Sequence, residues 1–416
     1  MSSGQTIERP RPKEPAKTAD PAASPARPGR APPASGGRDL RLDFFRGLAL
    51  VFIFIDHIPE NILSYFTLQS AQFYDAAEVF IFISGYTAAL VYGRTMAGQG
   101  ALFGTAQILR RAWQLYVAHI FLFVIFIAEV SYTVMTFHNP MYNDEMRVGD
   151  FLGEPHVAVI EALLLQFQPT YLDILPVYIV LLATFPLVII GLRWRPLVVL
   201  LPSVALYVLV QALNLSVPAY PPGSIWYFNP LAWQFLFTTG AALSLGVVPA
   251  NFLRRSKRAL LAAAVILVVG FVVRFSWTIH GLWDPFPGLL LRELWPVNKT
   301  NLSPLRLVPF LAAVALVAAL VPPGAAFLRS AAARPLVLCG RQSLEIFCLG
   351  ILLSALGHFV LSEYETGVPA KIAVNAVGIA IMYLTARTID WYKTMGRAPS
   401  RPVMAASPSR EDGFGG

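Results

Sequence analysis

The segment RGLALVFIFIDHIPENILSYF, residues 46–66, contains an apolar run long enough to cross a lipid bilayer. Arg46 opens the run, and Asp56 and His57 lie well inside it. An ionisable side chain is costly at that depth, so it usually has a function. The segment therefore predicts a transmembrane helix that carries chemically active groups.

The whole chain has the composition of a membrane protein. Of its 416 residues, 56% are hydrophobic and only 13% are charged, and the mean hydropathy is +0.58. Nearly charge-free windows of about 20 residues recur along the chain, without the alternating pattern of β-barrel strands. These features predict an all-α fold, a polytopic membrane protein.

The apolar windows predict about ten membrane-spanning helices. Their ranges are 44–63, 75–94, 112–135, 172–192, 196–213, 231–249, 259–280, 304–322, 342–361 and 369–389. The apolar segment 157–168 is too short to span a bilayer, so we expect an interfacial or re-entrant helix there.

The net charge of +8 follows this topology. With the N-terminus in the cytoplasm, most arginines and lysines fall on the cytoplasmic side and few on the outer loops, as the positive-inside rule requires. We therefore expect both termini in the cytoplasm and no nucleic-acid partner. The only two cysteines, Cys339 and Cys348, fall at the predicted cytoplasmic end of the span 342–361, so neither a disulfide nor a metal site is expected.

Three parts follow one another along the chain. Residues 1–38 are rich in proline, alanine, arginine and serine, which is typical of a disordered tail, here predicted to be cytoplasmic. Residues 39–392 form the predicted membrane domain. Residues 393–416 resemble the first tail in composition and are expected to be a second disordered cytoplasmic tail.

Ionisable residues converge on the first two predicted spans. Arg46 and His57 are eleven positions apart, close to three helical turns, so they share one helix face about 16 Å apart along the axis. The next span runs antiparallel, which brings Glu78 near the depth of His57, where a carboxylate can orient an imidazole and raise its basicity. Asp56 can reach the site only from the side. The alternative is a histidine that neighbouring helices satisfy, but this convergence favours catalysis.

At these residues the sequence resembles the acyltransferase-3 superfamily of membrane acyltransferases. The resemblance rests on four motifs in order: RLDFFRGLALVFIFIDH (41–57), VFIFISGY (79–86), RRAWQLY (110–116) and LCGRQSLEIFCLG (338–350). The longer segments DFFRGLALVFIFIDHIPEN, AAEVFIFISGYTAALVYGR and GRQSLEIFCLG are similar to the OpgC branch, which is associated with succinylation of osmoregulated periplasmic glucans. Two positions depart from the superfamily pattern: LSGF is ISGY here, and Gly350 stands where a histidine often ends the last motif.

The resemblance covers residues 38–392 and implies a multi-pass O-acyltransferase of the bacterial inner membrane. It implies acyl-CoA from the cytoplasm as co-substrate, with succinyl-CoA as the candidate, and a periplasmic glucan or other glycan hydroxyl as acceptor. His57 would be the general base, with Glu78 and Asp56 beside it. No permanently bound cofactor, metal or protein partner is expected; the remaining partner is the lipid bilayer.

Arginines on the predicted cytoplasmic side suit the phosphates of CoA. Arg46 is the strongest candidate because it shares the face of His57. Arg94, Arg110 and Arg111 are further candidates, but each is equally well explained as a topology signal.

Other residues are candidates for binding the acyl group and the sugar. Arg274 could hold the free carboxylate of a succinyl group, although intramembrane arginines are more often structural partners of a buried acid such as Glu129. Trp226 and Trp283 lie in predicted outer loops. They fit either an interfacial aromatic belt, the commoner role, or a surface that stacks against sugar rings.

A transporter or flippase of glycan or lipid-linked sugar is the main alternative. Buried charges and ten spans suit it, but the sequence has no internal repeat and no paired broken helices. A membrane scaffold or sensor is a third class and would not need His57. The substitution His57→Ala separates the three, since only an acyltransferase loses glycan modification with the glycan normally located.

Overall fold

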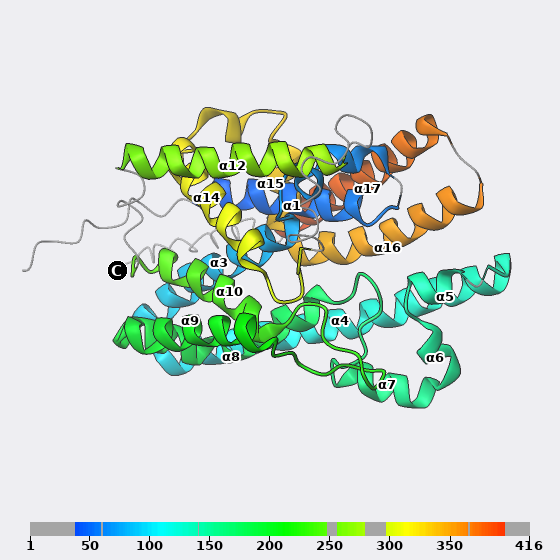
Figure 1. Ribbon diagram of the computed structural model, residues 1–416, viewed down its shortest axis with the longest axis horizontal. Coiled ribbons are helices and arrows are strands. Elements are labelled where there is room, and N and C mark those ends of the chain that lie inside the picture. Colours follow the sequence, from blue (N-terminus) through cyan, green and yellow to red (C-terminus); the bar gives the residue numbers. More distant parts are fainter. Residues whose placement is uncertain are drawn as a thin grey trace, which may run out of the picture. The chain divides into compact units, whose positions relative to one another are not determined.

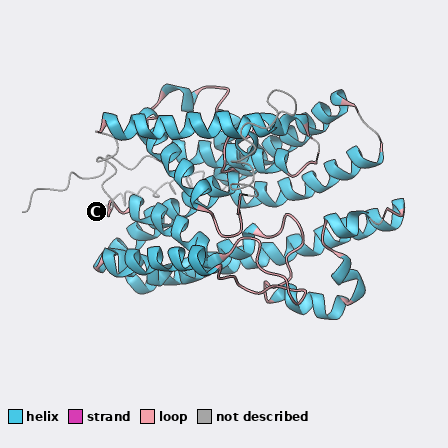
Figure 2. Ribbon diagram, viewed as in Figure 1, coloured by secondary structure: helices cyan, strands magenta, loops and turns pink. Residues whose placement is uncertain are grey.

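The computed structural model describes residues 38–59, 61–139, 141–247, 256–278, 297–364 and 367–395. The chain divides into two units, residues 1–38 and 39–416, and the described elements all belong to the second. Every regular element within those ranges is a helix (Figure 2). Both predicted disordered tails fall almost entirely outside the described residues.

Helices follow one another through the second unit (Figure 1). They are α1 (Leu40–Asp56), η1 (Ile62–Phe66), α2 (Leu68–Ala71), α3 (Ala76–Gln99), α4 (Ala101–Phe137), α5 (Met141–Glu145), α6 (Gly149–Gly153), α7 (Pro155–Leu163), α8 (Ile174–Trp194), α9 (Pro196–Leu213), α10 (Pro230–Ser244), α12 (Lys257–Thr278), α14 (Pro304–Leu320), η2 (Ala326–Arg329), α15 (Arg334–Arg341), α16 (Ser343–Glu363) and α17 (Val368–Met395). Each of the ten predicted spans coincides with one of the longer helices, which confirms the all-α class. The predicted interfacial segment contains the nine-residue α7.

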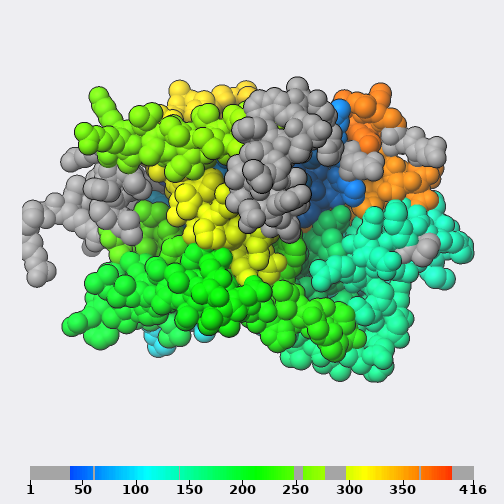
Figure 3. All heavy atoms as spheres, viewed as in Figure 1, coloured from blue at the N-terminus to red at the C-terminus, as the bar shows by residue number. Residues whose placement is uncertain are grey.

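Seven of the described helices are long and apolar enough to cross a membrane: α3, α4, α8, α9, α12, α16 and α17. α14 is a shorter apolar helix, and α1 and α10 have 17 and 15 residues. Leucines and valines of α9 and α12 are exposed to the outside of the protein, and both helices form part of the visible surface in Figure 3. Exposed aliphatic side chains on long helices are what contact with lipid requires. The chain is therefore a polytopic membrane protein, while its orientation remains a prediction.

The first helix is shorter than predicted. α1 ends at Asp56 rather than near residue 63, and His57 is its C-terminal cap residue. The Asn61 side chain donates a hydrogen bond of 3.0 Å to the carbonyl of Ile55, which satisfies one of the last carbonyls of the helix. Pro59 follows closely, and proline cannot donate to a continuing helix. His57 therefore lies at a helix end, where a cavity can form around it.

Glycines let the helices around the site approach closely. A Cβ atom at Gly85 of α3 would meet the backbone of Phe237 on α10, and one at Gly240 of α10 would meet the backbone of Phe82 on α3. Small residues allow such backbone contact between membrane helices. The glycine of the ISGY motif thus fixes α3 against α10, and any larger residue there would push the two helices apart.

Candidate active site

His57 lies beside a polar cavity at the end of α1. The cavity has a volume of about 340 Å³, and we name it the His57 cavity. Its lining residues are Ile53, Asp56, His57, Gln69, Asp75, Ala76, Ala77, Arg147, Thr170, Tyr171, Asp173, Ile174, Tyr227, Phe228, Lys299 and Phe347. Carboxylates, an amide and phenol rings dominate its polar groups, and these are side chains that can hydrogen-bond to sugar hydroxyls.

The ring of Tyr171 holds His57 in place. The two ring centroids are 4.4 Å apart, and Tyr171 adopts a φ of 74°. A non-glycine residue in the left-handed region is strained, and such residues cluster at functional sites. The loop between α7 and α8 therefore accepts backbone strain in order to place this phenol over the imidazole.

The imidazole of His57 is poised as a neutral base. Burial, and next the positive charge of Lys299, lower the pKa of His57 to about 3. Its Nδ1 atom is buried and has no hydrogen-bond partner among the residues that the structure describes. An imidazole that is neutral at physiological pH can accept a proton from a hydroxyl.

Two carboxylates flank His57 in the cavity. Asp56 accepts a hydrogen bond of 2.6 Å from the hydroxyl of Thr67, which fixes its orientation. Burial raises the pKa of Asp173, at the start of α8, to about 6. The structure thus places both Asp56 and Asp173 in the lining of the His57 cavity, and the catalytic role of Asp56 remains a prediction.

Glu78 is buried next to this cavity in a charge network. It accepts a 2.6 Å hydrogen bond from Nε of Arg306, and its other oxygen accepts one of 3.0 Å from the backbone N–H of Asp75. Asp75 in turn pairs with Arg306 at 2.9 Å and with Lys299 at 2.8 Å. The charges of two carboxylates and two cations therefore cancel at the start of α3. Both Glu78 oxygens accept bonds within this network, and the orienting role predicted for it toward His57 remains a prediction.

Lys299 links the network to the cavity. It lines the His57 cavity and pairs with Asp75. Although burial opposes its charge, the nearby Asp75 carboxylate raises the pKa of Lys299 above its ordinary range. Lys299 therefore presents a permanent positive charge next to His57.

A second cavity lies along α1 toward the other end of the helix. It has a volume of about 140 Å³, and we name it the Arg46 cavity. It is lined by Arg46, Phe80, Ser84, Thr87, Ala88, Val91, Tyr92, Arg111, Leu115, Leu175, Tyr178, Ser343, Leu344 and Phe347. Two guanidinium groups among hydroxyls make a site suited to phosphate oxygens.

The four predicted phosphate-binding arginines separate into two pairs. Arg46 donates a 2.6 Å hydrogen bond to the hydroxyl of Thr87 and lines the Arg46 cavity with Arg111. Arg94 and Arg110 are exposed and line neither cavity. The structure therefore brings Arg46 and Arg111 together and leaves Arg94 and Arg110 at the surface.

Of the predicted sugar and acyl residues, Arg274 and Trp226 are described, and neither lines the His57 cavity. Arg274 donates a 3.0 Å hydrogen bond to the carbonyl of Gln69 and lines an adjoining cavity of about 200 Å³ that also contains Lys299. Trp226 is buried and donates to the Gln166 side chain at 3.3 Å, so its indole packs against the loop between α7 and α8. Trp283 lies outside the described residues.

Sequence reasoning missed three groups at the site. Lys299 and Arg147 line the His57 cavity, yet both were counted only as the few positive charges of the outer loops. Tyr171 contacts His57 from a loop, and no local pattern marks it. Asp173 was a usable signal, since it lies at the start of the predicted span 172–192, where a buried carboxylate is a candidate for a cavity wall.

Comparison with known families agrees with the motifs. A family model described as OpgC protein matches residues 38–394. No curated protein matches the chain. The matched range contains every residue that lines the two cavities.

Proposed function

The chain belongs to the OpgC family, and from that premise we propose that it is a membrane O-acyltransferase. It moves an acyl group from an acyl-CoA to a hydroxyl of a glucan or another glycan. Succinyl is the acyl group we favour, succinyl-CoA the donor, and the bacterial inner membrane the location. No protein partner is needed for this reaction.

One observation carries the proposal. Arg46 lies on α1 and His57 caps the end of the same helix, and each lines a different cavity. The arginine cavity suits the phosphates of the donor, and the polar cavity around His57 suits a sugar acceptor. The imidazole of His57 is neutral and lines the cavity in which the hydroxyl would bind, and general base catalysis requires an unprotonated base within reach of that hydroxyl.

The reaction follows from this placement. His57 takes the proton from the sugar hydroxyl as its oxygen attacks the thioester carbonyl carbon. The C–O bond forms, the C–S bond breaks, and the thiolate of CoA takes the proton back from His57. A positioned general base supplies about 10²–10⁴ of rate in such a step. Asp56 and Asp173 can accept hydrogen bonds from neighbouring sugar hydroxyls, which orients the attacking oxygen.

A succinyl group carries a free carboxylate, and this negative charge needs a cation beside it. Arg147 lines the His57 cavity and is exposed, so it lies where the cavity meets its surroundings. Lys299 lies deeper, and Arg274 lines the adjoining cavity. We propose these three cations as the candidates for the succinyl carboxylate, because a guanidinium or ammonium group pairs with a carboxylate.

Mass spectrometry of periplasmic glucans tests the function. A deletion strain is complemented with wild-type protein, His57→Ala, or His156→Ala as a control, since His156 is exposed on α7. We expect the mass of a succinyl ester on glucans from the wild-type and control strains and its loss with His57→Ala at equal protein level. Unchanged substitution with His57→Ala would refute the role of His57.

The transporter alternative predicts a different result in the same strains. There, His57→Ala would trap unmodified glucan on one side of the membrane. Fractionation of the glucan between cytoplasm and periplasm therefore distinguishes the two functions. We expect the glucan to be periplasmic in every strain.

A further inference from the structure

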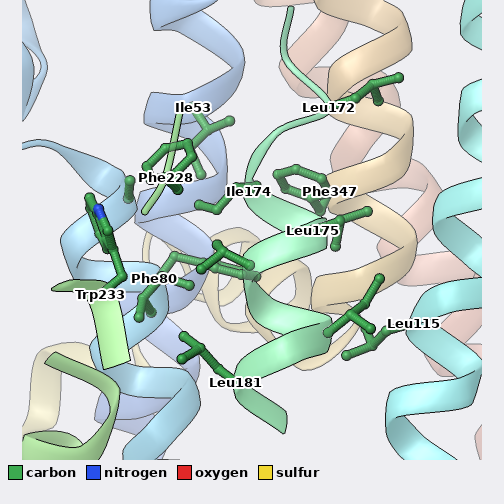
Figure 4. Close-up of a cluster of buried hydrophobic side chains, with 14 of the residues drawn as sticks. Ile53, Phe80, Leu115, Leu172, Ile174, Leu175, Leu181, Phe228, Trp233 and Phe347 are labelled. Carbon is green, nitrogen blue, oxygen red and sulfur yellow. The ribbon is translucent and has the colours of Figure 1, made fainter. Parts of the chain in front are cut away.

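Of the residues that the structure describes, Phe347 alone lines both the Arg46 cavity and the His57 cavity. Only 2% of its surface is exposed. On the facing helix α8, Ile174 lines the His57 cavity and the next residue, Leu175, lines the Arg46 cavity. Figure 4 shows the Phe347 side chain between α16 and α8, beside these two residues. The boundary between the cavities is therefore about one side chain thick.

An aromatic layer completes that boundary. The ring of Phe80 on α3 is 5.9 Å from the ring of Phe347 and 6.0 Å from that of Tyr178 on α8. Phe80 and Tyr178 line the Arg46 cavity but not the His57 cavity. Contacts of this kind make a dry layer, because rings at these separations leave little room for water.

The distance along α1 decides what must cross this layer. Arg46 and His57 are about 16 Å apart along the helix axis. A donor whose phosphates bind at Arg46 must therefore extend its acyl-bearing arm past Phe347 to bring the thioester to His57. Empty volume on both sides, about 140 and 340 Å³, allows the Phe347 ring to change rotamer.

We infer that Phe347 is the residue that separates donor from acceptor and determines which acyl groups reach His57. This inference rests on the proposed acyl transfer and deepens it. In the resting state the ring keeps the two cavities apart. When the donor binds, the ring moves aside, the thioester passes, and the arm itself then fills the opening. A bulky acyl group is excluded because the opening is only as wide as one aromatic ring.

The size of the side chain at position 347 should therefore affect hydrolysis of the donor and acyl transfer to the sugar in different ways. Phe347→Ala joins the cavities, so water reaches the thioester before the sugar does. Its oxygen bonds to the acyl carbon, the C–S bond breaks, and free acid and CoA thiol are released. Phe347→Trp enlarges the barrier, so the donor still binds at Arg46 while transfer falls.

The test uses the full-length protein purified into lipid nanodiscs. Release of CoA thiol from succinyl-CoA is measured with and without a glucan acceptor, and donor binding is measured by calorimetry. Phe359→Ala is the matched control, because Phe359 is buried on the same helix and lines neither cavity. Its ring centroid is 4.9 Å from that of Tyr142. Phe347→Leu accompanies Phe347→Ala in case the smaller side chain prevents folding.

We expect Phe347→Ala or Phe347→Leu to raise the ratio of hydrolysis to transfer by about tenfold, and Phe347→Trp to lower transfer by about tenfold with unchanged donor affinity. Pivaloyl-CoA, whose branched acyl group is wider than an unbranched chain, should be a poor donor for the wild type and a better one for Phe347→Ala. Behaviour equal to that of Phe359→Ala would overturn the inference. If wild-type protein released no CoA thiol from any acyl donor in the presence of glucan, the proposed function itself would fail.

Discussion

Removing one cation from the network at the start of α3 should destabilise the protein strongly. Arg306 is 7% exposed and is bonded to Glu78, which is fully buried, and to Asp75. Arg306→Gln removes two charge-assisted hydrogen bonds and leaves the buried Glu78 carboxylate without its cation. Breaking a buried ion pair from one side costs about 3–5 kcal/mol, because the remaining charge stays desolvated. The same loss is expected for Glu78→Gln, which leaves the Arg306 charge with Asp75 alone.

The double variant Glu78→Gln/Arg306→Gln identifies the cause of that loss. Two neutral amides can hydrogen-bond to each other, so we expect the double variant to be more stable than either single variant. Thermal unfolding in nanodiscs, followed by intrinsic fluorescence at a fixed heating rate, compares the four proteins. The account would be refuted if Arg306→Gln left the unfolding temperature unchanged, or if the two single losses simply added in the double variant.

Other predictions concern the two cavities and the buried imidazoles. Arg46→Lys should raise the KM for acyl-CoA by about tenfold with little change in kcat, since a lysine cannot make the bidentate contact of a guanidinium with phosphate. Arg110→Lys, at an exposed position, should leave KM unchanged, and equal KM values for both variants would contradict phosphate binding at Arg46. His119 is fully buried, and within the described part of the chain neither ring nitrogen has a hydrogen-bond partner. His119→Leu should therefore raise stability by about 1–3 kcal/mol, and a lower unfolding temperature would show that the imidazole has a partner. Because burial lowers the pKa of His57 to about 3, the base stays unprotonated well below its ordinary pKa. The double variant Asp56→Asn/Asp173→Asn removes the two cavity carboxyls that themselves titrate near neutral pH, and its kcat/KM should remain flat from pH 7 to pH 5. An acidic limb centred on the ordinary histidine pKa would contradict a neutral buried base.

The lowered pKa of His57 also makes the stability of the protein depend on pH. A histidine whose pKa is lower in the folded than in the unfolded state binds fewer protons when folded. The contribution of His57 to stability is therefore fully present above its unfolded pKa of 6.5 and is lost as the pH falls from there toward about 3.

The helices could be predicted from the sequence because lipid imposes a length and an apolar composition on each of them. The end of α1 could not be placed as well. The sequence shows an apolar run to residue 63, but the Asn61 side chain and Pro59 end the helix at Asp56. Local capping therefore decided where His57 lies.

The partners of the site could be predicted only in part. Asp56 and His57 are adjacent in the sequence, and Arg46 follows from the helical repeat. Arg306 pairs with Glu78 across 228 positions, a contact that only the packing of α14 against the start of α3 creates. Lys299 was likewise indistinguishable from a charge that sets topology.

The central claim is that His57 is the base for acyl transfer. The most direct measurement is the rate of CoA release from succinyl-CoA by purified protein in nanodiscs, with glucan as acceptor, for wild type, His57→Ala and His156→Ala. The account predicts acceptor-dependent release by wild type and His156→Ala, and a loss of about 10²–10⁴ for His57→Ala with donor binding retained. Acceptor-dependent release by His57→Ala at the wild-type rate would contradict it.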